Sequence, residues 1–154
     1  MPSNEEYLDL AIQLARKNVD EHHGRPFGAV LVDKGQIVST GVNEIHATHD
    51  PSTHAEMQAI RAATSARRSP RLDGCVMYAS GNPCPMCLAL MHMIGIGEVY
   101  FAYSNADAEP FNLSTAKIYA EMAKPLAQQS IKIVYLPVQP DMELYKVWQR
   151  STKG

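Results

Sequence analysis

Two short clusters of metal-binding residue types constrain this chain more than any other feature. Residues 54–56 read His-Ala-Glu, and residues 83–87 read Pro-Cys-Pro-Met-Cys. An imidazole nitrogen and two thiolates suit tetrahedral zinc, and a catalytic zinc site uses three protein ligands and keeps one position open. A chain that binds zinc through both clusters must fold so that two distant segments meet at one point. The predicted zinc ligands are His54, Cys84 and Cys87.

The second residue type of interest is an acid beside the predicted metal. Glu56 follows His54 by two positions and lies near the zinc without having to bind it, so it can carry protons for a zinc-activated water. If helices begin at His54 and just after Pro83, both positive helix ends favour thiolate over thiol. A structural zinc knuckle or a redox motif is the alternative. A closed structural site would want a fourth ligand, and Cys75, inside an apolar strand, is predicted to be a core residue.

The composition predicts one compact domain over residues 1–154. A chain of 154 residues with 45% hydrophobic content can bury a proper core. Its net charge of −2 gives no general attraction for nucleic acid, so a small neutral substrate is favoured. No apolar run approaches the ~20 residues that span a bilayer, and C-x-x-C fits a metal site in a reducing compartment. We expect a cytoplasmic protein that binds neither membranes nor nucleic acid.

Helical and strand patterns alternate along the chain. Ser3 with Glu6 is typical of a capping box, and two β-branched runs around residues 33–35 predict a hairpin. The order of elements predicts an α/β fold with a central mixed sheet of five strands and helices on both faces. The predicted helices cover a first segment through Val19 and residues 54–66, 85–94, 114–123 and 142–150; the predicted strands cover residues 27–32, 36–42, 75–80, 98–102 and 131–136.

Taken together, the two motifs match the pattern of zinc-dependent nucleobase deaminases, and the chain resembles the cytidine-deaminase-like superfamily from end to end. That resemblance implies a three-layer α/β/α sandwich around a zinc-activated water. Within the superfamily the chain is most similar to the guanine deaminases, which implies hydrolysis of guanine to xanthine and ammonia in purine catabolism. Zinc-bound hydroxide would attack the ring, and Glu56 would be the proton shuttle. The similarity lies in residues 26–29, Asn43, 50–56, 83–88, 118–121 and Trp148.

The same resemblance implies a pocket for the base. Phe27 would flank the ring, Asn43 would hydrogen-bond its polar edge, and the backbone amides of Ala55 and Cys84 would contact it. Met93 stands where guanine deaminases have an aromatic residue that helps build the pocket, and methionine can also pack on a base. A core position for Phe27 and a turn hydrogen bond for Asn43 fit the sequence as well.

The resemblance also implies a homodimer. In that assembly the C-terminal segment around Tyr145 and Trp148 would cross to the partner and help close the partner's active site.

Three features depart from the guanine deaminase pattern. Asn82 replaces the glutamate expected before the Pro-Cys motif, Met93 replaces the pocket aromatic, and residues 111–117 carry no acid where an acidic pair is expected. Asp107 and Glu109, just upstream, could substitute for that pair.

These departures keep other substrates and functions open. The ring could be another aminated heterocycle, such as cytosine, isocytosine, a pterin or a triazine. A tRNA adenosine deaminase would need basic residues around the pocket to neutralise phosphates, which the weakly acidic chain disfavours. A catalytically inactive, zinc-stabilised binding module would have no use for Glu56, because a structural site needs no carboxylate that is not a ligand.

Overall fold

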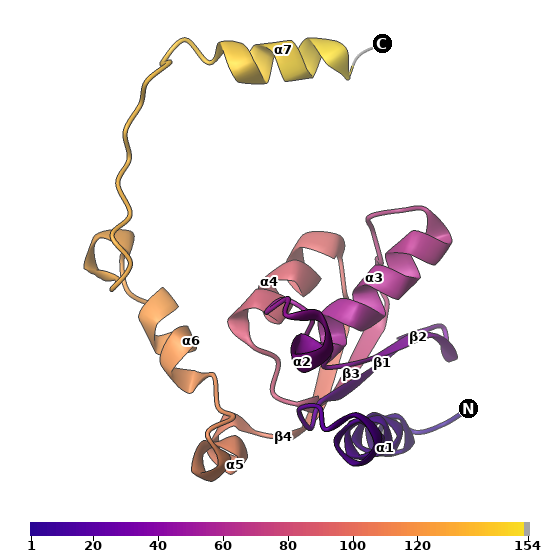
Figure 1. Cartoon of the computed structure of the whole chain (residues 1–154). Helices are drawn as coiled ribbons and strands as arrows, with labels where there is room; N and C mark the ends of the chain where they lie inside the picture. The colour runs from indigo at the N-terminus through magenta and orange to yellow at the C-terminus, as the bar shows by residue number, and fades with distance from the viewer. Residues whose placement is uncertain (153–154) are drawn as a thin grey trace. The chain divides into compact units, whose positions relative to one another are not determined.

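The computed structural model describes residues 1–152, which fall into two compact units, residues 1–119 and the segment that follows Tyr119 (Figure 1). The first unit contains the sheet. The first unit's elements are α1 (Asn4–His22), β1 (Gly28–Asp33), β2 (Gln36–Val42), α2 (Ile45–Thr48), α3 (Ala55–Arg67), β3 (Val76–Gly81), α4 (Pro85–Ile94), β4 (Glu98–Tyr103), α5 (Asn105–Ala108) and the 3-10 turn η1 (Glu109–Phe111). Helix α6 (Ala116–Met122) begins in the first unit, and the 3-10 turn η2 (Leu126–Gln128) and α7 (Glu143–Ser151) belong to the second.

The sheet is mixed, as predicted. Its order is β2-β1-β3-β4, with β1 antiparallel to both neighbours and β3 parallel to β4. The predicted hairpin between β1 and β2 is confirmed. Its two central residues, Lys34 and Gly35, have φ values of 50° and 78°, which are the positive angles that a tight two-residue hairpin turn requires.

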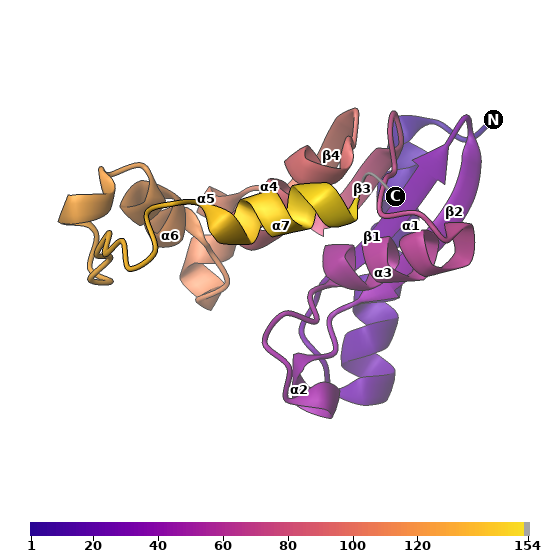
Figure 2. The same ribbon diagram turned by 90° about the horizontal axis from the view of Figure 1, so that it is seen from above.

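Helices cover both faces of this sheet within residues 1–119 (Figures 1 and 2). Side chains alternate along β1, so Val30 and Val32 pack with α1, while Ala29 and Leu31 pack with α3 and α4. All four side chains are buried. The prediction of an α/β fold with helices on both faces is therefore confirmed for this unit.

Two glycines let the helices lie directly on the strands. A Cβ built at Gly28 would overlap the Ala11 carbonyl oxygen of α1, and a Cβ at Gly41 would overlap the Ala55 carbonyl oxygen of α3. The close approach at Gly41 sets the distance between the N-terminus of α3 and β2. Because His54 immediately precedes α3, Gly41 also helps to position a predicted zinc ligand.

The predicted boundaries of the main elements in the first unit hold to within a few residues. Ser3 caps α1 by accepting a hydrogen bond from the Glu6 backbone N–H at 3.2 Å, and the helix continues to His22, beyond the predicted Val19. The sequence did not predict α2, α5, η1 or η2, because elements of three or four residues are too short to show an apolar period.

The predicted fifth strand over residues 131–136 is wrong. The described residues form a four-stranded sheet, and residues 131–136 are irregular. Their apolar side chains are exposed, by 73% for Ile131 and 62% for Val134. A β-branched run becomes a strand only where its side chains pack and its backbone pairs, and the unit that contains this run has no strand among its described residues.

The last helix, α7, has exposed apolar side chains. Leu144, Tyr145 and Trp148 of α7 are all exposed, while Arg150 pairs with Glu143 at 2.8 Å. Among the helices of the described chain, none combines the length and apolar character needed to cross a bilayer.

We predict that Gly41→Ala lowers the free energy of unfolding by about 1–3 kcal/mol, because the new methyl group must push α3 away from β2. Thr40→Ala is the matched control, since Thr40 lies on the same strand and is exposed. Urea titration of both variants measures the effect. Equal stability of the two variants would show that α3 does not rest on Gly41.

Candidate active site

Two of the predicted zinc ligands occupy equivalent places at the starts of two helices. His54 is the N-cap of α3, with φ −72° and ψ 158°, and Cys84 is the N-cap of α4, with φ −71° and ψ 165°. Pro85 takes the first position of α4, where a missing N–H costs no hydrogen bond. The predicted helix starts are confirmed, and both positive helix ends lie at the ligands.

A hydrogen-bonded turn before α3 leaves the His54 ring free. Asp50 Oδ1 accepts hydrogen bonds from the Ser52 backbone N–H at 2.9 Å and from the Ser52 hydroxyl at 2.6 Å. The Thr53 hydroxyl donates to the Asp50 carbonyl at 2.8 Å. These capping-type residues build the turn instead of capping the helix, and the His54 side chain makes no capping hydrogen bond.

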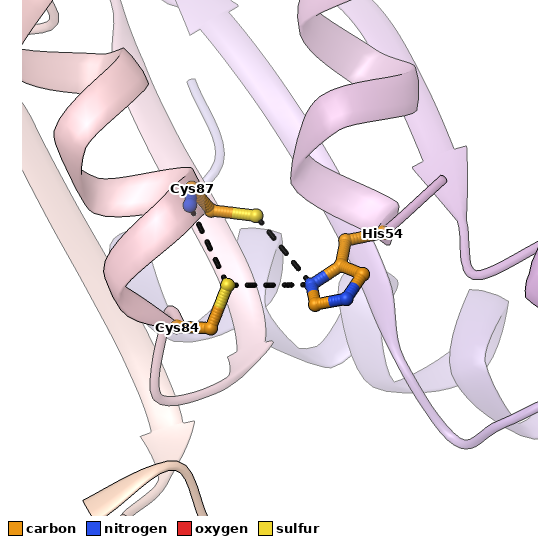
Figure 3. Close-up of side chains that lie close together, drawn as sticks. All are labelled: His54, Cys84 and Cys87. Carbon is orange, nitrogen blue, oxygen red and sulfur yellow. Dashed lines mark hydrogen bonds between the residues drawn. The ribbon is translucent and has the colours of Figure 1, made fainter. Parts of the chain in front are cut away.

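The three predicted ligands converge (Figure 3). His54 Nδ1 lies 3.4 Å from Cys84 Sγ and 3.7 Å from Cys87 Sγ, and all three donor atoms lie within 4.8 Å of one another. Zinc bonds of about 2.3 Å to sulfur and 2.0–2.1 Å to nitrogen in a tetrahedron separate S and N ligands by about 3.6 Å. The donor set therefore fits zinc.

The three side chains of the cluster shift one another's pKa values, because they share hydrogen bonds at short distances. A hydrogen bond from the Cys87 thiol lowers the pKa of Cys84 to about 4, and the same interaction raises the pKa of Cys87. The hydrogen bond between His54 and Cys84 raises the pKa of His54. Metal binding requires deprotonated ligands, and the negative Cys84 sulfur is already favoured.

Glu56 lies in the first turn of α3, and its side chain is buried, with 6% of the residue exposed. Burial raises the pKa of this carboxyl to about 7, and the negative charge of Cys84 adds to the rise. A carboxyl with a pKa near neutrality can both accept and donate a proton at neutral pH.

A cavity of about 140 Å³ opens onto the cluster. Drug-sized ligands usually occupy pockets of about 300–1,000 Å³, so this cavity suits a compact ring. Its walls combine ends of β1, β2 and β3 with the start of α4 and the loop after η1. They are formed by Arg25, Phe27, Asn43, His54, Glu56, Gly81, Asn82, Cys84, Asn112, Leu113, Ser114 and Thr115.

The family model of the cytidine and deoxycytidylate deaminase zinc-binding region matches residues 1–103, which include the whole ligand cluster. The chain belongs to this zinc-binding deaminase family. Zinc is therefore the cofactor of the protein, and His54, Cys84 and Cys87 form the cluster that could hold it.

Similar proteins within the deaminase family cover most of the chain. A guanine deaminase of Bacillus subtilis (strain 168) is 33% identical over 147 residues, which are 96% of this chain and 94% of that protein. A tRNA-specific adenosine deaminase of Aquifex aeolicus (strain VF5) is 29% identical over 91% of this chain and 89% of its own length. The crystal structure of a Bacillus subtilis guanine deaminase superposes with a TM-score of 0.89 at 32% identity, covering 97% and 95% of the two chains.

The structure places most, but not all, of the predicted substrate residues at the cavity of this deaminase. Phe27, Asn43 and Cys84 line it. Ala55 is buried at the start of α3 and does not belong to the lining. Met93 lies near the end of α4, is 73% exposed, and is not among the residues that line the cavity.

Phe27 and Asn43 are held by contacts of their own. The Phe27 ring lies close to Gly81, where an added Cβ would approach it to 3.1 Å. Asn43 is buried; its Oδ1 accepts from the Ile45 backbone N–H at 3.1 Å, and its own backbone N–H donates to the Phe27 carbonyl at 3.2 Å. The expected turn hydrogen bond of Asn43 is therefore present at a residue that also borders the cavity.

Sequence reasoning missed Arg25 and the wall formed by residues 112–115. Arg25 shows no periodic or motif signal, and the resemblance marked residues 111–117 only as the place of an absent acidic pair. Both segments are loops, which reach a cavity through long-range folding. Tyr119 was also missed as a support: its hydroxyl donates a hydrogen bond to the Pro83 carbonyl, next to a zinc ligand.

The two acids proposed as substitutes do not border this cavity. Asp107 Oδ2 accepts from the Ser104 backbone N–H at 2.8 Å in a capping box of α5, and Glu109 begins η1. Neither belongs to the lining.

We predict that Cys87→Ala removes the zinc, because a cluster reduced to two protein ligands binds the metal far more weakly. Cys75→Ala is the control: Cys75 is buried but is not part of the ligand cluster. Metal analysis of purified protein measures the zinc content. Loss of zinc in the Cys75 variant, or full zinc in the Cys87 variant, would contradict the assignment.

Proposed function

We propose that this protein hydrolyses guanine to xanthine and ammonia, with Glu56 as the catalytic proton carrier. One observation carries the proposal: a buried carboxyl with a pKa near 7 borders the same cavity as His54 and Cys84 but does not belong to the ligand cluster. The similarity to a guanine deaminase over 96% of the chain supports guanine as the ring.

The proposed reaction needs one water and two proton transfers. When bound at His54, Cys84 and Cys87, zinc supplies a water of lowered pKa. The water oxygen bonds to the amino-bearing carbon of the ring, and Glu56 moves the first proton from the water to the adjacent ring nitrogen. The second proton passes from the new hydroxyl group through Glu56 to the amino nitrogen. The C–N bond then breaks, and ammonia leaves as the carbonyl forms.

The chain's own groups would orient the ring for this attack. Phe27 would flank the ring, and Asn43 would hydrogen-bond its polar edge, since both line the cavity. The backbone N–H groups of Ala55 and Cys84 stand at helix starts, where N–H groups have no partner within the helix, and they would contact the substrate. Met93 is exposed and does not line the cavity, so its contact with the base stays a prediction from the resemblance.

A second candidate substrate is adenosine in a tRNA anticodon loop. The similarity to a tRNA-specific adenosine deaminase favours it. The small cavity and the net charge of −2 favour a free ring over a polyanion.

We propose that residues 1–154 act as a single deaminase domain and that two chains form a homodimer. The exposed apolar side chains of Tyr145 and Trp148 support an interface on α7. In a dimer this helix would help close the partner's active site. We also propose a cytoplasmic location, because the zinc site needs reduced thiols at Cys84 and Cys87.

We predict that Glu56→Gln lowers kcat for ammonia release from guanine by about a hundredfold to ten-thousandfold, because the amide cannot carry protons. Zinc content and the unfolding midpoint should stay close to those of the native protein. The native protein should be assayed on free bases, nucleosides and a tRNA anticodon stem-loop. Turnover of the stem-loop alone, or of none of these compounds, would refute guanine deamination.

A further inference from the structure

The cavity contains a positive charge that the proposed mechanism does not use. Arg25 is the one arginine or lysine among the residues that line it, and Glu56 is the one acid. The wall formed by residues 112–115 and Asn82 contributes neutral polar or apolar groups. The described walls therefore carry two charged groups of opposite type: the Glu56 carboxyl and the Arg25 guanidinium, which can donate hydrogen bonds to a ring.

The Arg25 guanidinium is available to a ligand. Within residues 1–152 it takes part in no ion pair and no hydrogen bond, although Arg16, Arg67 and Arg71 each pair with an aspartate. An arginine has five N–H donors and no acceptor, so an unpaired one favours a group that accepts hydrogen bonds.

The backbone at Arg25 is held firmly beside the predicted substrate residues. The Arg25 carbonyl accepts hydrogen bonds from Asn18 Nδ2 at 2.9 Å and from the Phe27 backbone N–H at 2.8 Å. Asn18 is buried and also donates to the Asn43 carbonyl at 2.9 Å. One buried amide thus ties the Arg25 backbone to the strand end that carries Asn43, a second residue that lines the cavity.

We propose that Arg25 determines specificity by selecting aminated purines with a carbonyl on the ring edge remote from the reacting amino group. Arginine binds the O6 and N7 acceptors of guanine as a bidentate donor in protein–DNA complexes, and the same edge lies opposite the 2-amino group of the free base. The inference rests on the proposed deamination. A guanidinium beside that edge would repel a second ring amino group, and it would lose its acceptor if the oxygen were missing.

The test compares guanine with 2-aminopurine, which has the same reacting carbon but lacks the oxygen at position 6. Arg25→Gln should lower kcat/KM for guanine about tenfold to a hundredfold, which is typical of the loss of a hydrogen bond to a charged group. For 2-aminopurine the change should be less than about threefold, and Arg25→Lys should recover part of the guanine activity. Arg16→Gln is the control, because Arg16 is exposed on α1 and does not line the cavity.

Several outcomes would overturn the inference. An equal loss for both rings would show a structural role, and unchanged guanine activity would show no contact. Selective loss of activity on guanosine monophosphate, but not on guanine, would mean that Arg25 binds a phosphate instead of the ring. If the native protein released ammonia from neither ring, the proposed deamination itself would fail. Zinc content measured on every variant separates these effects from loss of the metal site.

Discussion

The site depends on the meeting of two helix N-termini. Helices α3 and α4 begin directly after His54 and Cys84, and Cys87 stands in the first turn of α4. Three donor atoms can share one metal only if these helix starts stay within a few ångströms of each other. The same arrangement directs positive helix ends at two sulfur atoms and a carboxyl, which favours anionic ligands.

The remainder of the first unit holds these two helix starts in place. The close approach of α3 to Gly41 sets the position of His54 over the sheet, and β3 leads through Asn82 into the start of α4. The Asn82 backbone N–H donates to the Tyr103 carbonyl at 2.8 Å and so extends the pairing of β3 with β4 up to the site. The predicted zinc ligands stand at the starts of two helices that share one core cluster, so fold and chemistry are linked here.

Local patterns predicted the ligand set, the helix starts and most of the sheet, because each depends on residues close together in the sequence. The 131–136 segment was mistaken for a strand because strand formation needs a partner that sequence pattern does not reveal. Arg25 and residues 112–115 were not predicted as walls of the cavity for a related reason, because both reach it through long-range packing. Met93 was assigned to the pocket by similarity alone, and it lies exposed near the end of α4, outside the lining of the cavity.

We expect three protein groups to hold zinc and to leave one position for water. X-ray absorption spectroscopy at the zinc edge of the purified protein measures this coordination. We expect one zinc per chain with two sulfur neighbours at about 2.3 Å and two nitrogen or oxygen neighbours at about 2.0–2.1 Å. A shell of three or four sulfur atoms, or a protein that binds no zinc, would show that His54, Cys84 and Cys87 do not form an open zinc site.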